Sequence, residues 1–274
     1  MRLVILLLLL LVAGCGMGHT ELVCYAGPNM RTSVEALARV YKQRTGVSVH
    51  VESDEPRRLI DRIVASRSAD LFVSHDPFLA MLIARGIGVR DARTVASLTP
   101  VIAVPKGNPR NIAGLEDLAR PGLRVGLTDA ETSISGHIVT LMLKKAGISR
   151  QVEANVVLRA PQGRDLAAAL VAGQIDAAIV WNAVVAGSCG QLEAVAIDAK
   201  FRPARNVDAI VDSASLGRLE LDYVRVTVAT LDCSKNPVEA RSFANFLASG
   251  EGTAVFLKNG LSPPDLNRPT LPGR

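Results

Sequence analysis

The chain has 274 residues, of which 49% are hydrophobic, 21% charged and 4% aromatic. This composition excludes a disordered or collagen-like chain and suits one large or two small folded domains. Lysine and arginine number 31 against 26 aspartates and glutamates, a surplus of five, but the charges are scattered and the chain has one tryptophan and three tyrosines. A nucleic-acid-binding protein usually clusters basic residues and interleaves aromatic ones, so we expect no nucleic-acid partner. The mildly basic balance suits an anionic small solute or an anionic membrane surface.

The N-terminus has the pattern of a secretion signal. Arg2 precedes an apolar run at 3–12, which is too short for a membrane-spanning helix of about 20 residues. The run ends in Val-Ala-Gly-Cys at 12–15, which resembles the bacterial lipobox. This resemblance implies a lipoprotein signal peptide at 1–14, a lipidated Cys15 and a short tether at 15–20, and loss of Arg2 leaves a surplus of about four. We therefore expect a protein anchored to a membrane outside the cytoplasm. An ordinary secretion signal with a chance cysteine is the alternative.

Short β-rich runs alternate with helical patterns along the rest of the chain. The pattern predicts strands over 22–25, 47–51, 69–73, 101–104, 124–127, 156–158, 177–180, 195–197 and 223–229. It predicts helices over 32–45, 57–65, 78–84, 115–119, 135–146, 164–172, 237–247 and 253–259. Repeated β–α units indicate an α/β fold in which helices flank mostly parallel sheets. The proline-rich tail at 262–273 is expected to be only partly ordered.

The loops that follow the strands are the expected place for a ligand, because ligands bind beyond the carboxyl ends of strands in such sheets. Two of these loops lead into helices, at Ser135 and at Gly163. The free N–H groups at a helix start favour an anion. Taken singly, each loop is more typical of ordinary helix capping.

Three further cysteines stand at 24, 189 and 233. Cys24 lies in an apolar run and is expected to be buried. Cys189 and Cys233 lie in polar loops and are candidates for a disulfide. The cysteines do not have metal-ligand spacing, and we expect neither a metal nor a cofactor.

Read in order, these segments resemble the periplasmic molybdate-binding proteins of ABC importers, which have the type II solute-binding fold. The segments are Tyr-Ala-Gly-Pro-Asn-Met at 25–30, Ala-Asp-Leu-Phe-Val-Ser-His-Asp at 69–76, Val-Pro-Lys-Gly-Asn-Pro at 104–109, Gly-Gln-Ile-Asp-Ala-Ala-Ile-Val-Trp at 173–181, and the ending at 236–252 followed by Gly260. The resemblance implies two α/β lobes, formed by 21–100 with 200–274 and by 101–199, and joined by two crossing strands. The chain is expected to cross near 98–103 and to return between 184 and 206, with the last helices on the first lobe.

The resemblance also implies a monomeric receptor, not an enzyme, that binds a molybdate- or tungstate-like oxyanion and serves a membrane permease. Carried over by position, the family's oxyanion site falls on Asn29, Ser135, Gly163 and Trp181. The second loop departs from the family pattern, because Asp54 and Glu55 stand beside the position expected to hold a serine. Two carboxylates would repel a dianion, and Arg57 could offset them as a bidentate donor.

Two other functions stay open. A same-fold receptor for a metal ion or an organic solute would have Asp54, Glu55, His75 and Asp76 as candidate metal ligands, although histidine is scarce. A secreted hydrolase would need a base, for which His75 is the best-placed histidine. The sequence contains neither a Gly-x-Ser-x-Gly elbow nor a His-Glu-x-x-His helix, which favours the receptor.

Overall fold

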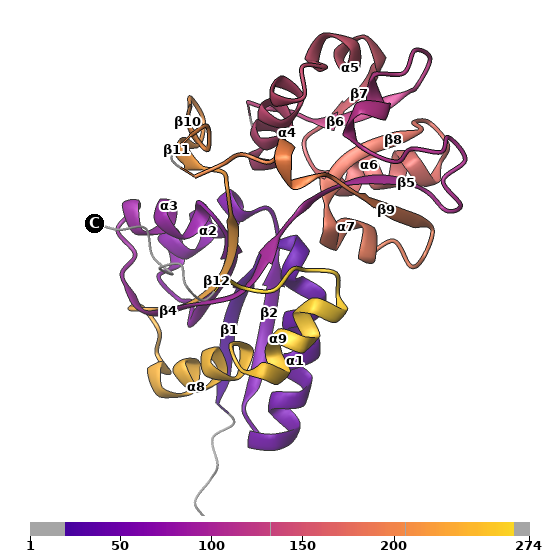
Figure 1. The fold of residues 1–274 in the computed structure, drawn as a ribbon. Coiled ribbons are helices and arrows are strands. Elements are labelled where there is room, and N and C mark those ends of the chain that lie inside the picture. The colour runs from indigo at the N-terminus through magenta and orange to yellow at the C-terminus, as the bar shows by residue number, and fades with distance from the viewer. Residues whose placement is uncertain (1–19, 132, 206, 266–274) are drawn as a thin grey trace, which may run out of the picture.

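The computed structural model describes residues 20–131, 133–205 and 207–265, which form two lobes (Figure 1). The strands are β1 (Glu21–Ala26), β2 (Ser48–Ser53), β3 (Leu71–His75), β4 (Val89–Leu98), β5 (Pro100–Pro105), β6 (Val125–Thr128), β7 (Val156–Ala160), β8 (Ala177–Trp181), β9 (Leu192–Ala196), β10 (Ile210–Ser213), β11 (Gly217–Glu220) and β12 (Val224–Leu231). The α-helices are α1 (Arg31–Thr45), α2 (Pro56–Ser66), α3 (Phe78–Ala84), α4 (Ile134–Lys145), α5 (Ser149–Asn155), α6 (Gly163–Val171), α7 (Asn182–Ala186), α8 (Pro237–Leu247) and α9 (Gly250–Lys258). Short 3-10 helices are η1 (Pro28–Met30), η2 (Leu115–Ala119) and η3 (Ala199–Phe201).

Each lobe is built on one five-stranded sheet. Lobe 1 has the order β2-β1-β3-β12-β4, in which β1 is parallel to β2 and β3 while β12 is antiparallel to β3 and β4. Lobe 2 has the order β7-β6-β8-β5-β9, in which β6 is parallel to β7 and β8 while β5 is antiparallel to β8 and β9. The predicted mixed α/β fold is confirmed. The residue boundaries predicted for the lobes stay a prediction.

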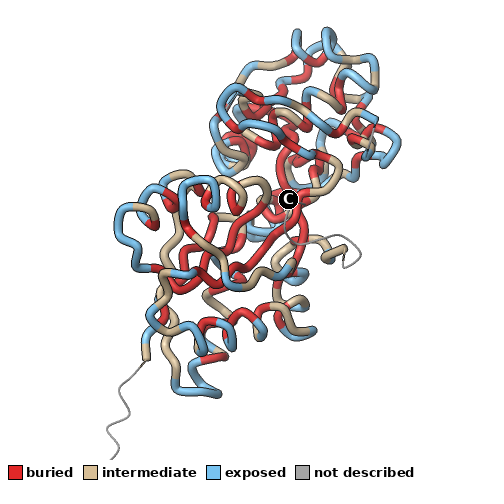
Figure 2. The backbone as a smooth tube through the Cα atoms, turned by 90° about the vertical axis from the view of Figure 1, so that its left-hand side faces the viewer, coloured by how far each residue is buried: buried red, intermediate tan, exposed pale blue. Residues whose placement is uncertain are grey.

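Apolar helix faces cover the sheets as the sequence pattern predicts. In α1, Val34, Leu37, Ala38 and Tyr41 are all buried, and Gly46 ends the helix at φ 78°. The largest apolar cluster includes side chains from both lobes, and a smaller one lies where α6 packs on the second sheet. Figure 2 shows buried segments inside both lobes. The parallel strands are therefore held by apolar packing on their faces, which fixes the positions of their carboxyl ends.

The chain passes from lobe 1 to lobe 2 at Thr99, between β4 and β5, and a hydrogen-bond network holds this crossing. Asn182 accepts the Thr99 N–H at its Oδ1 (3.1 Å) and donates from its Nδ2 to the Ser262 hydroxyl (2.9 Å). The hydroxyls of Thr99 and Ser262 lie 2.7 Å apart, and Ser262 forms a β-bridge with Ser97. Three distant segments of the chain thus meet at one hinge.

The structure corrects several sequence-based expectations. β9 still belongs to the second sheet and the first sheet resumes only at β12, so the return crossing predicted between 184 and 206 stays a prediction. The hairpin of β10 and β11 was not predicted, and neither were β4, α5 and α7. The first half of β4 is polar and largely solvent-facing, so it lacks the apolar pattern of a buried strand. Residues 115–119 form a 3-10 helix, and most of the tail at 262–273 lies outside the described residues.

The expected disulfide is wrong for this structure, in which Cys24, Cys189 and Cys233 are all free thiols. Cys189 lies in the exposed turn between α7 and β9, whereas Cys233 follows β12 in the other lobe. The Cys233 thiol contacts the carbonyl of Ala69 at 3.4 Å. The two cysteines therefore belong to different sheets and face different surroundings. Cys24 is buried, as expected.

The lobes also meet through His75, the last residue of β3. Its ring centroid lies 6.2 Å from that of Trp181, the last residue of β8, and 5.1 Å from that of Phe78. His75 is buried, and its Nδ1 lies 2.7 Å from the carbonyl oxygen of Asp76. Burial lowers the pKa of His75 to about 4 from the ordinary 6.5. Near pH 7, an uncharged His75 ring therefore contacts Trp181 and joins the carboxyl end of β3 in lobe 1 to that of β8 in lobe 2.

Because the unfolded chain binds a proton on His75 that the folded chain excludes, the free energy of unfolding should rise with pH between about 4 and 6.5. His75→Gln should flatten this rise by up to about 3 kcal/mol, at about 1.4 kcal/mol for each unit of pKa shift. Urea titrations across that pH range measure the change. The matched control is His50→Gln, because the His50 side chain is 59% exposed. Equal pH slopes for wild type and His75→Gln would refute the assignment.

Candidate functional site

The lobe 2 residues of the predicted site gather at one edge of the second sheet. Strands β6, β7 and β8 run parallel, so their carboxyl ends share an edge. Ser135 follows β6 in the first turn of α4, Gly163 follows β7 as the first residue of α6, and Trp181 ends β8. A Cβ placed on Gly163 would lie 3.4 Å from side-chain atoms of Val180 and Val184, next to Trp181. The fold thus brings three predicted residues to one surface.

The starts of α4 and α6 have unused donors. Gln162 precedes α6 without a side-chain cap, and the N–H groups of Gly163 and Arg164 have no acceptor among the described residues. The Ser135 N–H likewise has no acceptor in the described part of the chain. Close approach of α4 to the preceding loop requires Gly136, because a Cβ there would lie 2.4 Å from the Asp129 carbonyl oxygen. Both helix starts can therefore donate to an anion.

Three hydroxyls form a chain at the start of α4. The Ser135 hydroxyl lies 2.8 Å from that of Thr128 and 2.7 Å from that of Ser133, and Ser133 also accepts the Gly136 N–H at 3.4 Å. Thr128 is buried and has no other partner among the described residues, whereas Ser133 is half-buried. A buried hydroxyl proton without an acceptor costs about 1–3 kcal/mol. We therefore expect the Thr128 hydroxyl to donate to Ser135 and the Ser135 hydroxyl to donate to Ser133. The Ser133 proton is then left to donate to a group outside this chain of hydroxyls.

Ser133 and Thr128 are absent from the predicted ligand-binding residues. The available signal was the Ser-x-Ser pattern at 133–135 before an apolar helix, since the first serine of such a pattern commonly caps the helix. The pattern alone does not show that the Ser135 hydroxyl is used internally. That conclusion needs Thr128, which comes from the preceding strand.

Lobe 1 contributes Asn29 to the opposite surface. Strands β1, β2 and β3 are parallel, and η1, which contains Asn29, follows β1 at the shared carboxyl edge. Asn29 is half-buried, and its side chain makes no hydrogen bond to a described residue. Its amide is therefore available as a donor, and its predicted role in ligand binding stays a prediction.

In the second loop of lobe 1, which joins β2 to α2, both carboxylates already have partners within the protein. The Asp54 carboxylate lies 2.8 Å from the Arg62 guanidinium and 3.7 Å from that of Arg58. The Glu55 carboxylate caps α2 by accepting the N–H groups of Arg57 and Arg58 at 3.0 and 3.3 Å. The backbone donors at the start of α2 are thus occupied by a carboxylate of the protein itself.

Arg57 contacts the β10–β11 hairpin, which bridges the lobes. Its Nη2 donates to the carbonyl and hydroxyl oxygens of Ser215 at 3.3 and 3.4 Å. The Ser215 hydroxyl in turn donates to the Glu131 carbonyl, and His137 Nε2 lies 2.9 Å from the Ser213 hydroxyl. Arg57 is therefore placed as a link between lobe 1 and the hairpin, while Ser213 and Ser215 link the hairpin to lobe 2.

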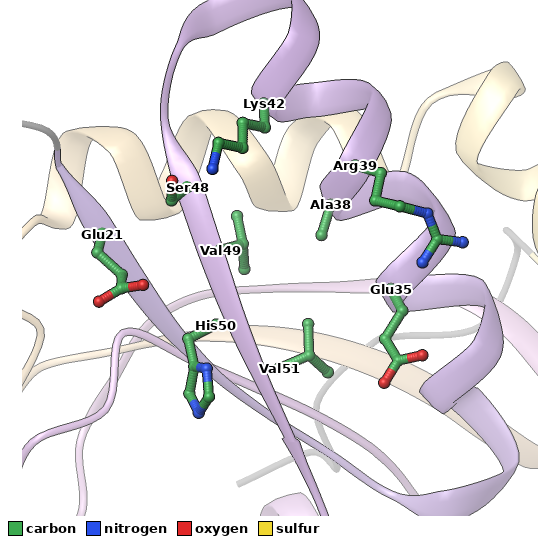
Figure 3. Close-up of a pocket in the computed structure, with 9 residues that line it drawn as sticks. All are labelled: Glu21, Glu35, Ala38, Arg39, Lys42, Ser48, Val49, His50 and Val51. Carbon is green, nitrogen blue, oxygen red and sulfur yellow. The ribbon is translucent and has the colours of Figure 1, made fainter.

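One cavity lies beside the hairpin and another lies on the far side of lobe 1. One of about 100 Å³ lies between the lobes, next to the start of α4, and is lined by Asp76, Pro77, Ala80, Ile134, Arg218, Leu219, Glu220, Leu221, Val224 and Arg225. The Asp76 carboxylate lies 2.7 Å from the Arg225 guanidinium. The other, of about 310 Å³, lies on the open outer side of α1 and β2, as Figure 3 shows with Glu35, Lys42 and His50. Neither includes Asn29, Ser135, Gly163 or Trp181.

The structure does not assemble the alternative metal site. Among residues 20–265, apart from 132 and 206, no three histidine, cysteine, aspartate or glutamate side chains are grouped to hold a metal ion. Asp54 pairs with Arg62 and Glu55 caps α2, whereas His75 contacts Phe78 and Trp181 and Asp76 pairs with Arg225. In the same described part, no helix has the length and apolar character needed to cross a membrane. Cys15 and the predicted signal peptide lie outside the described residues.

Comparison with known proteins gives relatives along nearly the whole chain. The "putative binding protein" of Haemophilus influenzae is 26% identical over 243 residues, which is 89% of this chain and 91% of that protein. The molybdate-binding protein ModA of Mycobacterium tuberculosis is 23% identical over 255 residues, covering 92% and 88%. The predicted resemblance to molybdate-binding proteins is thereby confirmed.

Two solved structures show the same fold. The substrate-binding domain of a putative molybdenum ABC transporter from Clostridium difficile matches with a TM-score of 0.71 and 17% identity, covering 90% of this chain and 100% of that chain. PEB3, a Campylobacter jejuni protein whose structure contains L-phospholactate, matches with a TM-score of 0.69 and 21% identity, covering 88% and 99%. At these identities the likeness concerns the fold alone.

The family model described as "bacterial extracellular solute-binding protein" matches residues 22–262. Its members are binding proteins, in agreement with the prediction that the chain is not an enzyme. The chain belongs to the family of bacterial extracellular solute-binding proteins.

Proposed function

We propose that this protein is the extracytoplasmic receptor of an ABC importer and that it binds a small oxyanion, such as molybdate or tungstate, between its lobes. The observation that carries the proposal is the set of unused donors at facing edges: the starts of α4 and α6 in lobe 2 and the Asn29 amide in lobe 1. The His75–Trp181 contact supports the view that the two edges face one another. Delivery to a membrane permease follows from the likeness to components of molybdenum transporters.

These donors are neutral, and they suit a fully deprotonated anion. Backbone N–H groups, an asparagine amide, the Ser133 hydroxyl and the Trp181 indole N–H can all donate, and helix starts add a favourable field. Each hydrogen bond to a charged group contributes about 1.5–3 kcal/mol, so several together suffice for micromolar binding, which corresponds to about 8 kcal/mol. His75 is neutral near pH 7 and adds no charge.

An oxyanion with a small organic substituent is a second candidate ligand. The cavity of about 100 Å³ adjoins Ile134, at the start of α4 beside Ser135, and could accept such a substituent. It is lined by both acidic and basic side chains, including Asp76 and Arg218, which favours a polar group. PEB3, with its bound L-phospholactate, shows that a protein of this fold binds a ligand of this kind.

A thermal-shift panel tests the class of ligand. We expect molybdate or tungstate to raise the melting temperature, because a ligand that binds only the folded state stabilises it. Sulfate, phosphate and L-phospholactate test the other anions, and divalent cations are the negative controls. Stabilisation by cations but by none of the anions would contradict the proposal.

Asn29→Leu should weaken molybdate binding about ten- to a hundredfold, because an apolar wall replaces a donor to the anion. Isothermal titration measures the affinity. Asp54→Asn is the companion variant, and it should have little effect because the Asp54 carboxylate is paired with Arg62. Loss of binding in Asp54→Asn with normal binding in Asn29→Leu would reverse the assignment and indicate a cationic ligand.

Ser133→Ala should weaken molybdate binding about tenfold, because it removes the outward hydroxyl proton, whereas Ser133→Thr keeps that proton and should bind normally. Thr128→Val removes only the inner end of the hydroxyl chain and should lower the molybdate affinity a few-fold at most. Titration of the four proteins gives the ranking. A larger loss in Thr128→Val than in Ser133→Ala would show that the chain runs the other way.

The membrane anchor is proposed from the sequence around Cys15. Cys15→Ala should leave the precursor unlipidated, because the thiol is the group that carries the lipid. Labelling of cells with a radioactive fatty acid, followed by membrane fractionation, measures this. Normal acylation and membrane retention of the variant would show that Cys15 is not the lipidated residue.

A further inference from the structure

Ser74, near the end of β3, has a buried hydroxyl for which the structure provides no partner. The residue is 1% exposed, and its Oγ makes no hydrogen bond within the described part of the chain. Buried polar atoms in folded proteins are nearly always paired, and an unpaired one destabilises the fold by about 1–3 kcal/mol. The Ser74 hydroxyl can therefore bind a partner outside the protein chain, and its place in the fold decides whether it does.

The position of Ser74 points to that surface. A Cβ placed on Gly27, at the start of the loop that holds Asn29, would lie 3.7 Å from Ser74 Oγ and 3.8 Å from a ring carbon of Pro56, the first residue of α2. Ser74 therefore lies where the first and second loops of lobe 1 meet. Gly27 has no side chain at this point, and the methyl group of the fully buried Met30 lies 2.7 Å from the same Cβ position. Methionine side chains are unbranched and adapt readily.

Lobe 1 also lacks the donor that the second loop was expected to supply. The N–H groups of Arg57 and Arg58 are taken by the Glu55 carboxylate. From lobe 1, a ligand held by several lobe 2 donors would meet the Asn29 amide, whereas the Arg57 guanidinium already donates to Ser215. The Ser74 hydroxyl, beside the first loop, would add a second uncharged donor from lobe 1.

We infer that the Ser74 hydroxyl is a ligand-binding group, which donates a hydrogen bond to the bound oxyanion beside Gly27 once the buried Met30 side chain shifts. This inference rests on the proposed function. It assigns the missing lobe 1 donor to a strand residue rather than to the second loop.

The test compares Ser74→Ala with Ser33→Ala by titration with molybdate and, as a second probe, sulfate. Ser33 is the matched control, because its hydroxyl is also buried and unpaired but lies on the core face of α1 with Val34 and Leu37. Ser74→Ala should weaken binding about tenfold while leaving the melting temperature of the unliganded protein unchanged or higher, since it removes an unpaired polar atom. Ser33→Ala should bind as wild type does.

The outcomes separate the inference from the proposed function. If wild type binds a probe and Ser74→Ala binds it equally well, the inference is wrong and the receptor proposal stands. Equal losses in both variants would show a general packing effect and also overturn it. If wild type binds none of the anions of the thermal-shift panel, the receptor proposal fails first and the inference fails with it.

Discussion

The hydrogen-bond network of Thr99, Asn182 and Ser262 is the constraint on which the rest of the binding surface depends. Asn182 directly follows Trp181, and the backbone N–H of Asn182 donates to the Thr99 carbonyl at 2.9 Å. The crossing therefore fixes the end of β8 relative to the start of β5. Ser262, which comes after α9, ties the C-terminal part of lobe 1 to the same point. Gly260 is needed beside it, because a Cβ there would lie 2.2 Å from the Ala186 Cβ in α7.

The two lobes differ in how they treat helix starts. In lobe 2 the first N–H groups of α6 have no acceptor among the described residues, whereas in lobe 1 the start of α2 is closed by Glu55. A protein carboxylate at a helix start satisfies the same donors and the same dipole as a bound anion would. An anionic ligand would accordingly depend more on lobe 2, and lobe 1 would complete the site through side chains.

The β10–β11 hairpin gives this chain a second connection between the lobes besides the crossings. Its turn contacts Arg57 on one side and the Glu131 carbonyl on the other, and Ser213 reaches His137. These contacts are polar, the hairpin also buries Leu216 and Leu219 in the main apolar cluster, and it belongs to neither five-stranded sheet. Closure of lobes around a ligand commonly uses a few adjustable residues in connecting segments. The hairpin is placed where such a motion would make or break its contacts.

The sequence by itself determined the α/β class, most strands and helices, and the loops that carry the candidate site. These rest on local rules: apolar spacing sets the buried face of α1, and Gly46 ends that helix. The polar first half of β4 and the short strands of the hairpin were missed, because such segments are stabilised by pairing with distant strands. The Glu55 cap on α2 is local, since it spans two or three residues, whereas only the tertiary structure decided that Thr128 of β6 engages the Ser135 hydroxyl. The direction of a side chain at a helix start depends on its neighbours in space, which residue spacing does not encode.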